Sequence, residues 1–155
     1  MEMNISFFVE GLPRPAGSKR AFAIKKGGVF TGRVAVADDN PKSKDWKCDV
    51  RNQARLAYPG APVDGPLKLL LVFTLPRPKN HFRSGKNANA LRESAPMFPA
   101  TRPDTTKLIR AVEDALTGIL WKDDAQITAQ VALKRYGTPI GVRIELSPDN
   151  KETLL

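Results

Sequence analysis

The chain has 155 residues, the usual size of one domain, and its 41% hydrophobic content predicts a folded globule rather than a disordered chain. Its one cysteine excludes an internal disulfide framework, and its one histidine excludes a zinc site built from several histidines. The formal net charge of +9 indicates a polyanionic partner, with nucleic acid as the first choice and plain solubility as the alternative explanation.

The N-terminal part of the chain predicts β-structure on both sides of a loop. Residues 5–11, ISFFVEG, alternate as a strand does, with some apolar character on both faces. Residues 12–20, LPRPAGSKR, predict a basic loop because proline and glycine disfavour regular structure there. Residues 21–40 then predict a hairpin that folds near Gly27 and Gly28.

A helix and a buried strand follow. Residues 40–58 predict the helix, with Asn40 as its cap and Pro41 in its first turn. Its apolar positions at helical spacing are Trp46, Val50, Ala54 and Ala57. Cys48 lies in this helix, where we interpret it as a small packed residue. Residues 67–76, LKLLLVFTLP, form a continuous apolar run that predicts a buried central strand.

Residues 77–102 predict a long loop, and loops of this length are usually functional or disordered. Its charged residues are six cations and the single acid Glu93, and Phe82 and Phe98 interleave with them. The cations are Arg77, Lys79, Arg83, Lys86, Arg92 and Arg102. This composition favours contacts with DNA phosphates.

The C-terminal part predicts one helix and two strands. Pro103 and Gly118 suit the two boundaries of the helix, and Asp104 is well placed as its cap. The helix buries a stripe of Leu108, Val112, Ala115, Leu116 and Ile119. Residues 126–137 and 141–148 both alternate as strands do. The first of these strands is predicted to gather Ile127, Ala129, Val131 and Leu133 on one face.

This order of elements predicts an α+β fold in which two main helices pack on a small mixed or antiparallel sheet. We expect a single domain over residues 1–147 and a loose polar tail over residues 148–155. No apolar run is long enough to span a membrane, and the N-terminus lacks a signal-peptide pattern. We therefore expect a protein of the bacterial or phage-infected host cytoplasm, with no membrane partner and no small-molecule cofactor.

Four aspartates in this basic chain could hold Mg²⁺, because hydrolysis of a phosphodiester needs a neutralised phosphate and an activated water. Each also has a structural explanation. Asp104 could be only a helix cap, and Asp114 could pair with Arg110 four residues earlier. Asp123 and Asp124 could be only turn residues before a strand.

The spacing of these aspartates leaves their convergence open. A helix of about 13 residues spans roughly 20 Å, so Asp104 and Asp124 meet only if the chain doubles back after Gly118. Otherwise a two-fold partner has to bring its own copy near. Lys107 and Arg110 lie one turn apart on the polar face of this helix, where a cation could stabilise charge on a transferring phosphate. A solvated helix face is the alternative.

Other chemistries find less support. Gly11 and Gly17 stand one residue too far apart for a nucleotide-triphosphatase phosphate loop, and the lysine and serine after them are reversed. A DNA backbone contact or a simple turn explains that loop instead. His81 has no evident partner, so we interpret it as a solvated loop residue. Ser18, Ser84 and Ser94 lack triad partners.

Two motifs together resemble the RusA-like Holliday junction resolvases, also called crossover junction endodeoxyribonucleases. They are RPDTTKLIRAVEDALTG and, after it, WKDDAQI. The segments GLPRPAGSKRAF and RPKNHFRSGKN are similar to phage-type members of that family. The resemblance covers most of the chain, from about residue 7 to about residue 144.

The resemblance implies a small α+β homodimer that cuts four-way DNA junctions with paired symmetric nicks, using Mg²⁺ or Mn²⁺. By position, Asp104 matches the first metal-binding aspartate and Asp124 matches the aspartate of the second motif, with Asp123 beside it. Arg110 stands where the family has an essential lysine. The side chains expected to grip DNA are Lys19, Arg20, Arg77, Lys79, Arg83, Lys86, Arg102 and Lys107.

The chain departs from the family pattern at Thr106, where the resemblance implies a second aspartate. A threonine hydroxyl is a much poorer Mg²⁺ ligand than a carboxylate. Our hypothesis is a metal-dependent endonuclease for branched DNA in recombination and repair. The alternatives are a junction-binding protein of the same fold with weak or lost activity, and a small basic RNA-binding protein.

Overall fold

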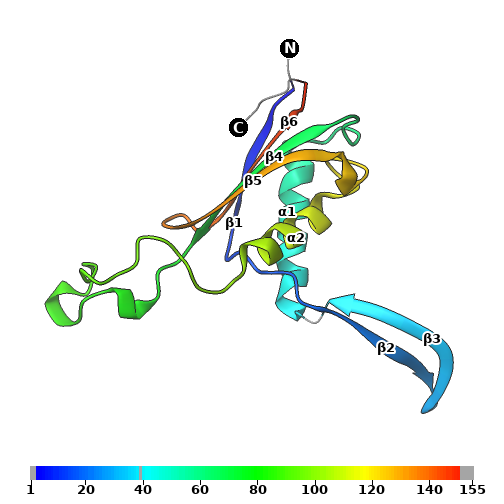
Figure 1. Cartoon of the computed structure of the whole chain (residues 1–155), viewed down its shortest axis with the longest axis horizontal. Helices are drawn as coiled ribbons and strands as arrows, with labels where there is room; N and C mark the ends of the chain where they lie inside the picture. The colour runs from blue at the N-terminus through cyan, green and yellow to red at the C-terminus, as the bar shows by residue number, and fades with distance from the viewer. Residues whose placement is uncertain (1–2, 39, 151–155) are drawn as a thin grey trace.

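The computed structural model describes residues 3–38 and 40–150 (Figure 1). Its α-helices and strands are β1 Ile5–Glu10, β2 Lys19–Lys26, β3 Val29–Asp38, α1 Pro41–Ala57, β4 Leu67–Leu75, α2 Thr105–Leu116, β5 Ile127–Tyr136 and β6 Gly141–Pro148. Short 3-10 turns occupy Lys79–His81, Gly85–Asn87 and Asp124–Gln126. The predicted α+β class is confirmed.

The main sheet is mixed and has the order β1-β6-β4-β5. Strand β4 runs antiparallel to β6 and parallel to β5, so it is the central strand that its apolar run predicted. Its side chains alternate between buried and half-buried along the whole strand, because helices cover only one face of the sheet (Figure 1). The half-buried face also carries Leu70 and Val72, which is why the sequence shows no polar alternation.

Both helices pack on that one face and form the core between themselves and the sheet. Asn40 caps α1 by accepting the Lys42 N–H, as predicted. Trp46, Val50 and Ala54 of α1 are buried, whereas Ala57 in the predicted stripe is exposed. The stripe of α2 is buried from Leu108 to Leu116, and Trp121 just beyond it is fully buried. These contacts hold α2 rigidly against the sheet, which matters because both acidic positions lie at its ends.

The predicted strand is present as β5, but the helices do not cover the apolar face that its alternation predicted. The register pairs Val131 with Leu70 and Leu133 with Val72, and the partner side chains lie on the face of β4 away from the helices. Val131 is therefore 43% exposed. Alternation showed which side chains share a face, but it could not show which face the helices cover.

Two further expectations need correction. Cys48 is exposed rather than packed, because it lies on the outer side of α1. The first residues of the predicted loose tail, Pro148 and Asp149, are also attached to the sheet. Pro148 still belongs to β6, and Asp149 pairs with Lys68 at 3.2 Å and accepts a hydrogen bond from Thr128 at 2.6 Å. Residues 151–155 of the predicted tail lie outside the described residues.

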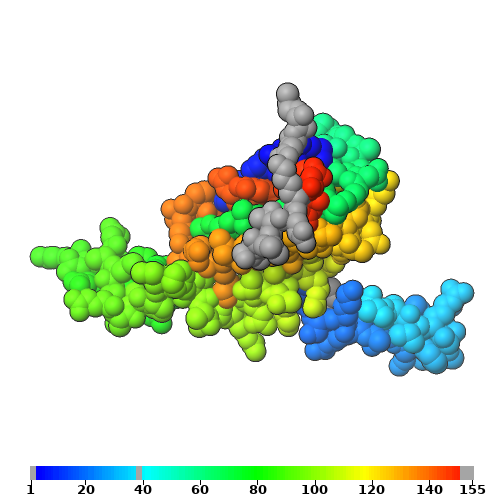
Figure 2. Space-filling view, turned by 45° about the horizontal axis from the view of Figure 1, so that its top comes forward, coloured from blue at the N-terminus to red at the C-terminus, as the bar shows by residue number. Residues whose placement is uncertain are grey.

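Two extensions project from this body in opposite directions (Figures 1 and 2). One is the hairpin of β2 and β3, called the hairpin arm below, whose turn lies at Gly27 and Gly28 as predicted. The other is the basic lobe, residues 77–98, which a Phe82–Leu91 bridge closes on itself. No helix among the described residues is long and apolar enough to cross a membrane.

Candidate active site

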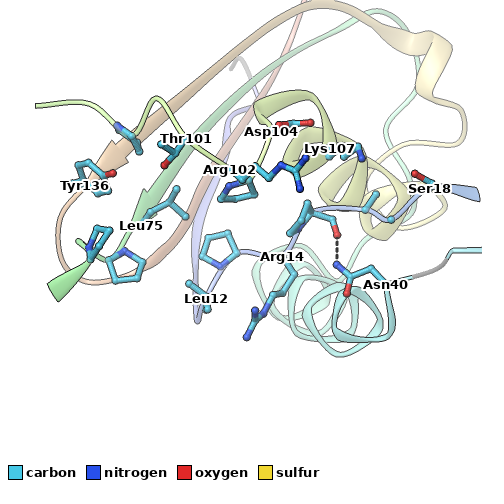
Figure 3. A pocket seen from close by; sticks show the side chains of 18 residues that line it. Leu12, Arg14, Ser18, Asn40, Leu75, Thr101, Arg102, Asp104, Lys107 and Tyr136 are labelled. Carbon is cyan, nitrogen blue, oxygen red and sulfur yellow. Dashed lines mark hydrogen bonds between the residues drawn. The ribbon is translucent and has the colours of Figure 1, made fainter. Parts of the chain in front are cut away.

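A groove of about 670 Å³ runs between residues 12–18 and residues 99–104 (Figure 3). The first wall is a proline-rich loop that two hydrogen bonds attach to the helices. The Ala16 N–H donates to the carbonyl of Lys107 in α2 at 2.9 Å. The Asn40 side chain, at the start of α1, donates to a carbonyl of the loop at 2.8 Å. The loop is therefore fixed relative to the N-terminal end of α2.

The second wall leads directly into α2 and is fixed by strand β5. Lys134 donates to the carbonyls of Thr101 and Pro103, at 2.8 and 2.9 Å. A lysine ammonium is a strong donor, and two carbonyls of one segment are ligands that hold it in place. The backbone just before Asp104 is thereby attached to the sheet.

Asp104 is the one acid among the described residues that line the groove, and it sits with the cations Arg14, Arg102 and Lys107. Figure 3 shows Asp104, Arg102 and Lys107 at one rim and Arg14 across from them. Asp104 occupies the N-cap position of α2, but its side chain makes no capping hydrogen bond within the described chain. Only its backbone carbonyl serves the helix, by accepting the Leu108 N–H at 3.0 Å. Capping therefore does not explain this exposed carboxylate.

Asp124 lies at the other end of α2. Its Oδ1 accepts hydrogen bonds from Trp121 Nε1, at 2.9 Å, and from the hydroxyl of Thr117, the C-cap residue of α2. Since Trp121 is fully buried, the Asp124 carboxylate has a fixed position. Its Oδ2 receives no hydrogen bond from the residues that the structure describes, so this oxygen is open to a ligand.

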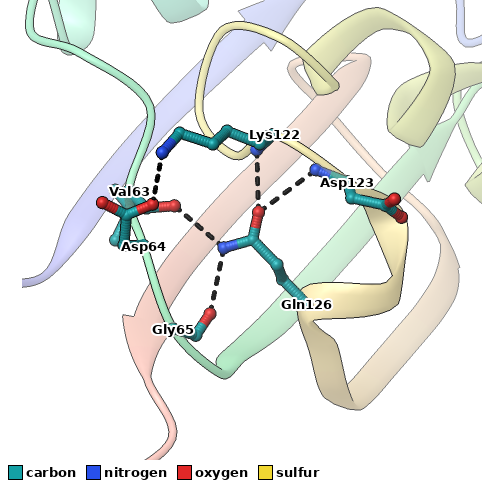
Figure 4. Close-up of polar contacts among 6 residues, drawn as sticks. All are labelled: Val63, Asp64, Gly65, Lys122, Asp123 and Gln126. Carbon is teal, nitrogen blue, oxygen red and sulfur yellow. Dashed lines mark hydrogen bonds and ion pairs between the residues drawn. The ribbon is translucent and has the colours of Figure 1, made fainter.

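Gln126 clamps the turn that carries the two neighbouring aspartates (Figure 4). Its Oε1 accepts the backbone N–H groups of Lys122 and Asp123, at 2.8 and 3.1 Å. Its Nε2 donates to the carbonyls of Val63 and Gly65, at 2.9 and 3.0 Å. The first two bonds close the turn, and the other two join it to the segment before β4, so the glutamine of this motif has a positioning role.

Asp123 caps the same turn. One of its oxygens accepts the Ala125 N–H at 2.8 Å, which completes a capping box with Gln126. Asp123 is thus the turn residue that the sequence offered as its structural explanation, and its second carboxylate oxygen takes no part in this cap.

The two acidic ends do not meet within one chain. Helix α2 has 12 residues, so about 18 Å of helix separates Asp104 from the C-cap that Asp124 contacts. The chain does not double back far enough to bring the two carboxylates together. The described residues contain no group of three or more histidine, cysteine, aspartate or glutamate side chains that could hold a metal ion. The described part of one chain therefore does not bring Asp104 and Asp124 to the same metal site.

Asp114 is not paired with Arg110 as the helical spacing predicted. It forms an ion pair with Lys47 of α1 at 3.1 Å, which fastens the two helices together. Arg110 is exposed and forms no ion pair with any residue that the structure describes. It does not line the groove, whereas Lys107 does. Arg110 is thus a solvent-facing cation one turn beyond the groove, available to an anionic partner.

The sequence of this chain is similar to known proteins over the region that contains these features. A family model described as Endodeoxyribonuclease RusA matches residues 13–147, which include the groove, α2 and the Asp124 turn. The chain belongs to the RusA endodeoxyribonuclease family. It is also 30% identical over 132 residues to the Uncharacterized protein YqaN of Bacillus subtilis (strain 168), a match that covers 85% of this chain and 87% of YqaN.

Sequence reasoning missed one acid of this RusA-family chain. Glu113 lies on α2 one turn before Thr117 and accepts a hydrogen bond from Gln130 of β5 at 2.5 Å. Burial raises its pKa, the negative charges of Asp124 and Asp114 raise it further, and the Gln130 bond opposes them. The i, i+4 spacing to Thr117 could have placed Glu113 near the C-terminal end of α2, but nothing in the sequence indicated Gln130.

The raised pKa of Glu113 predicts how the thermal stability of the fold depends on pH. Because the folded chain holds the Glu113 proton more tightly than the unfolded chain does, its contribution is present below about pH 4.5 and is lost as pH rises through the folded pKa. Glu113→Gln removes that loss of stability at high pH, because glutamine carries no charge, and it keeps an acceptor for Gln130. We expect its Tm to exceed that of the wild type by ~2 °C at pH 7.5 in EDTA, and to equal it at pH 4. Thermal unfolding followed by circular dichroism measures both.

Glu93→Gln, in the basic lobe, is the matched control for the loss of one negative charge. It should not reproduce this pattern. Equal melting temperatures for wild type and Glu113→Gln at pH 7.5 would contradict the burial effect.

The eight cations predicted to grip DNA lie in three places. Lys19 and Arg20 begin the hairpin arm, Arg77, Lys79, Arg83 and Lys86 belong to the basic lobe, and Arg102 and Lys107 line the groove. Of these, Arg77 also has a structural task. It donates to the Pro96 carbonyl at 2.7 Å and lies over the Tyr136 ring at 4.5 Å. His81 packs edge-on against the same ring at 5.4 Å, so it is not the solvated residue that we expected.

Proposed function

We propose that this chain is a metal-dependent endonuclease that cuts branched DNA, four-way junctions in particular, as a two-fold homodimer. One observation carries the proposal. A free carboxylate, Asp104, stands in a groove whose other charged groups are cations, and basic extensions leave from both ends of that groove. A polyanionic strand fits such a surface, and a single carboxylate within it suits the place where a cation is needed.

The active site in this proposal is shared between protomers. Asp104 of one protomer and Asp124 of the partner subunit, with Asp123 beside it, would hold Mg²⁺ or Mn²⁺. Support comes from the open Oδ2 of Asp124, from the Asp104 carboxylate that is free of capping, and from their separation within one chain. A two-fold dimer holds two such sites and suits a two-fold junction.

The bound ion would supply an activated water and neutralise phosphate charge. The protein's own groups do the remaining work. Lys107 and Arg102 hold the phosphate beside Asp104, and Gln126 keeps the second acidic turn in place. Arg110, one turn beyond the groove, would add a permanent positive charge near a phosphate on which negative charge builds.

Thr106 supports a second candidate function, that of a junction-binding protein with weak cutting activity. It is exposed in the first turn of α2, two residues after Asp104, where the resemblance implies an aspartate. A hydroxyl there leaves each site one carboxylate short. The RNA-binding alternative gains no support from membership of an endodeoxyribonuclease family.

The test is a cleavage assay on a labelled four-way junction and a linear duplex of the same sequence, with Mg²⁺, Mn²⁺ or EDTA. We expect paired symmetric nicks in the junction with either metal and none in EDTA. Binding should weaken steeply as salt rises, because several phosphates are contacted.

The other results of this assay distinguish the alternatives. Tight junction binding without nicks supports the weakened protein. Nicks in EDTA would refute the metal requirement, and equal cutting of both substrates would refute the preference for branched DNA.

A further inference from the structure

The hairpin arm has no place in the hydrophobic core. Strands β2 and β3 pair only with each other among the described strands, and they stand clear of the main sheet (Figures 1 and 2). Every residue of β2 is exposed. Six large apolar side chains of the arm are between 39% and 70% exposed, namely Phe22, Ile24, Val29, Phe30, Val34 and Val36. An isolated two-stranded hairpin is marginal in water, so this arm fits a surface that covers it.

The charge of the arm selects the kind of surface. Between residues 19 and 38 the sequence holds five cations and a single acid, Asp38. The cations are Lys19, Arg20, Lys25, Lys26 and Arg33. The phosphates of DNA attract such a run of cations. Charge complementarity therefore favours nucleic acid as the partner of the arm.

The register distributes these side chains over both faces. Alternation along β2 puts Arg20, Phe22, Ile24 and Lys26 on one face, and the Lys25–Phe30 pair lies on the other. Each face thus mixes cations, which suit phosphates, with aromatic or aliphatic groups, which suit bases. A two-stranded ribbon fits the major groove of B-DNA, and apolar side chains stack on or wedge between bases.

The position of the arm relates it to the groove. Strand β2 begins at Lys19, immediately after Ser18 in the groove wall, and the basic lobe leaves from the other end (Figures 1 and 3). Ten extended residues of β3 reach roughly 30 Å. DNA lying in the groove would therefore meet the lobe on one side of Asp104 and the arm on the other.

We propose that the hairpin arm is a DNA-binding arm whose cations hold phosphates and whose Phe30 contacts bases, on the side of the groove opposite the basic lobe. This inference rests on the proposed function, which places the cut strand in the groove. It extends DNA contact from Lys19 and Arg20 to the whole hairpin, and it assigns a role to the exposed apolar residues.

Photo-crosslinking identifies the occupant directly. The probe is p-benzoylphenylalanine in place of Phe30, in the full-length chain, with a labelled four-way junction bound. The control carries the same group in place of Leu56, which is 78% exposed on α1. We expect a protein–DNA adduct from position 30 and none from position 56. An adduct between two chains, or no DNA adduct from position 30, overturns the proposal.

A charge pair provides the second measurement. Lys25→Ala with Lys26→Ala is compared with Arg55→Ala and Arg143→Ala, which remove the same charge from α1 and β6. We expect the arm variant to bind the junction about 50-fold more weakly at 0.1 M salt, with the salt slope reduced by about 2. The control pair should change both values little. Equal effects from the two pairs overturn the proposal.

Failure of this inference and failure of the proposed function give different results. Metal-dependent nicks without a DNA adduct from position 30 reject the arm and keep the nuclease. A DNA adduct without nicks under any metal keeps the arm and rejects the nuclease. Absence of all junction binding rejects both.

Discussion

A mixture of Asp104→Asn chains and Asp124→Asn chains should cut four-way junctions, although each variant alone should not. Each substitution removes one metal-holding carboxylate, and a metal contributes several kcal/mol to the transition state, so we expect each pure variant to lose on the order of 10³-fold in rate. In a mixed dimer with shared sites, both substitutions fall in one site. The other site then contains wild-type Asp104 and wild-type Asp124.

The pattern of products makes this result diagnostic. A mixed dimer has one working site, so it should nick one strand of the pair rather than both. With random assortment, about half of the dimers are mixed, which gives about a quarter of the wild-type site activity. Denaturing gels of a junction labelled on each strand in turn measure the nicks.

The structure makes the Asp104→Asn substitution mild for folding. Asparagine remains a good N-cap at position 104, and the wild-type aspartate makes no side-chain capping bond there. The Tm of each variant, measured beside the wild type, is the control. An inactive mixture of well-folded variants would mean that one chain builds each site, in contradiction to the length of α2.

Thr106→Asp should increase the apparent affinity for Mg²⁺ in the cleavage reaction. Affinity for hard divalent cations rises with the number of charged oxygen ligands, so we expect the Mg²⁺ concentration for half-maximal rate to fall about tenfold. The substitution should not harm the helix, because Thr106 is exposed and negative charge is favourable in a first turn. Titration of Mg²⁺ against nicking rate, with Mn²⁺ binding measured by calorimetry, tests the expectation.

Thr105→Asp is the matched control, since it adds the same charge to the neighbouring position of the same helical turn. It should leave the Mg²⁺ requirement nearly unchanged. An equal gain from both variants would indicate a general electrostatic effect rather than a ligand at position 106. No gain from Thr106→Asp would show that the site works with the carboxylates it already has.

The sequence predicted those features that depend on local pattern. Helical spacing identified the buried stripe of α2, and the Gly27-Gly28 pair identified the turn of the hairpin arm. Features that depend on which elements pack together were not accessible. Spacing along α2 suggested Arg110 as the partner of Asp114, whereas Lys47 of the neighbouring helix forms the ion pair.

In the candidate site, too, local patterns were predictable and contacts between distant segments were not. The motif pointed to Asp104 and Asp124, but only the fold reveals that α2 keeps them apart. The role of Gln126 was also invisible in the sequence, because its partners Val63 and Gly65 lie about sixty residues earlier and become neighbours only through β4. Glu113 was missed for the same reason, since its partner belongs to β5.

The length of α2 has a consequence for how activity depends on protein concentration. If neither end of the helix can hold the metal alone, a lone protomer is harmless to DNA, and the rate of cutting follows the number of paired chains. At low concentration that number falls with the square of the concentration of free chains. Dilution would then act as an off switch, and a four-way junction that gathers two protomers would itself restore the activity.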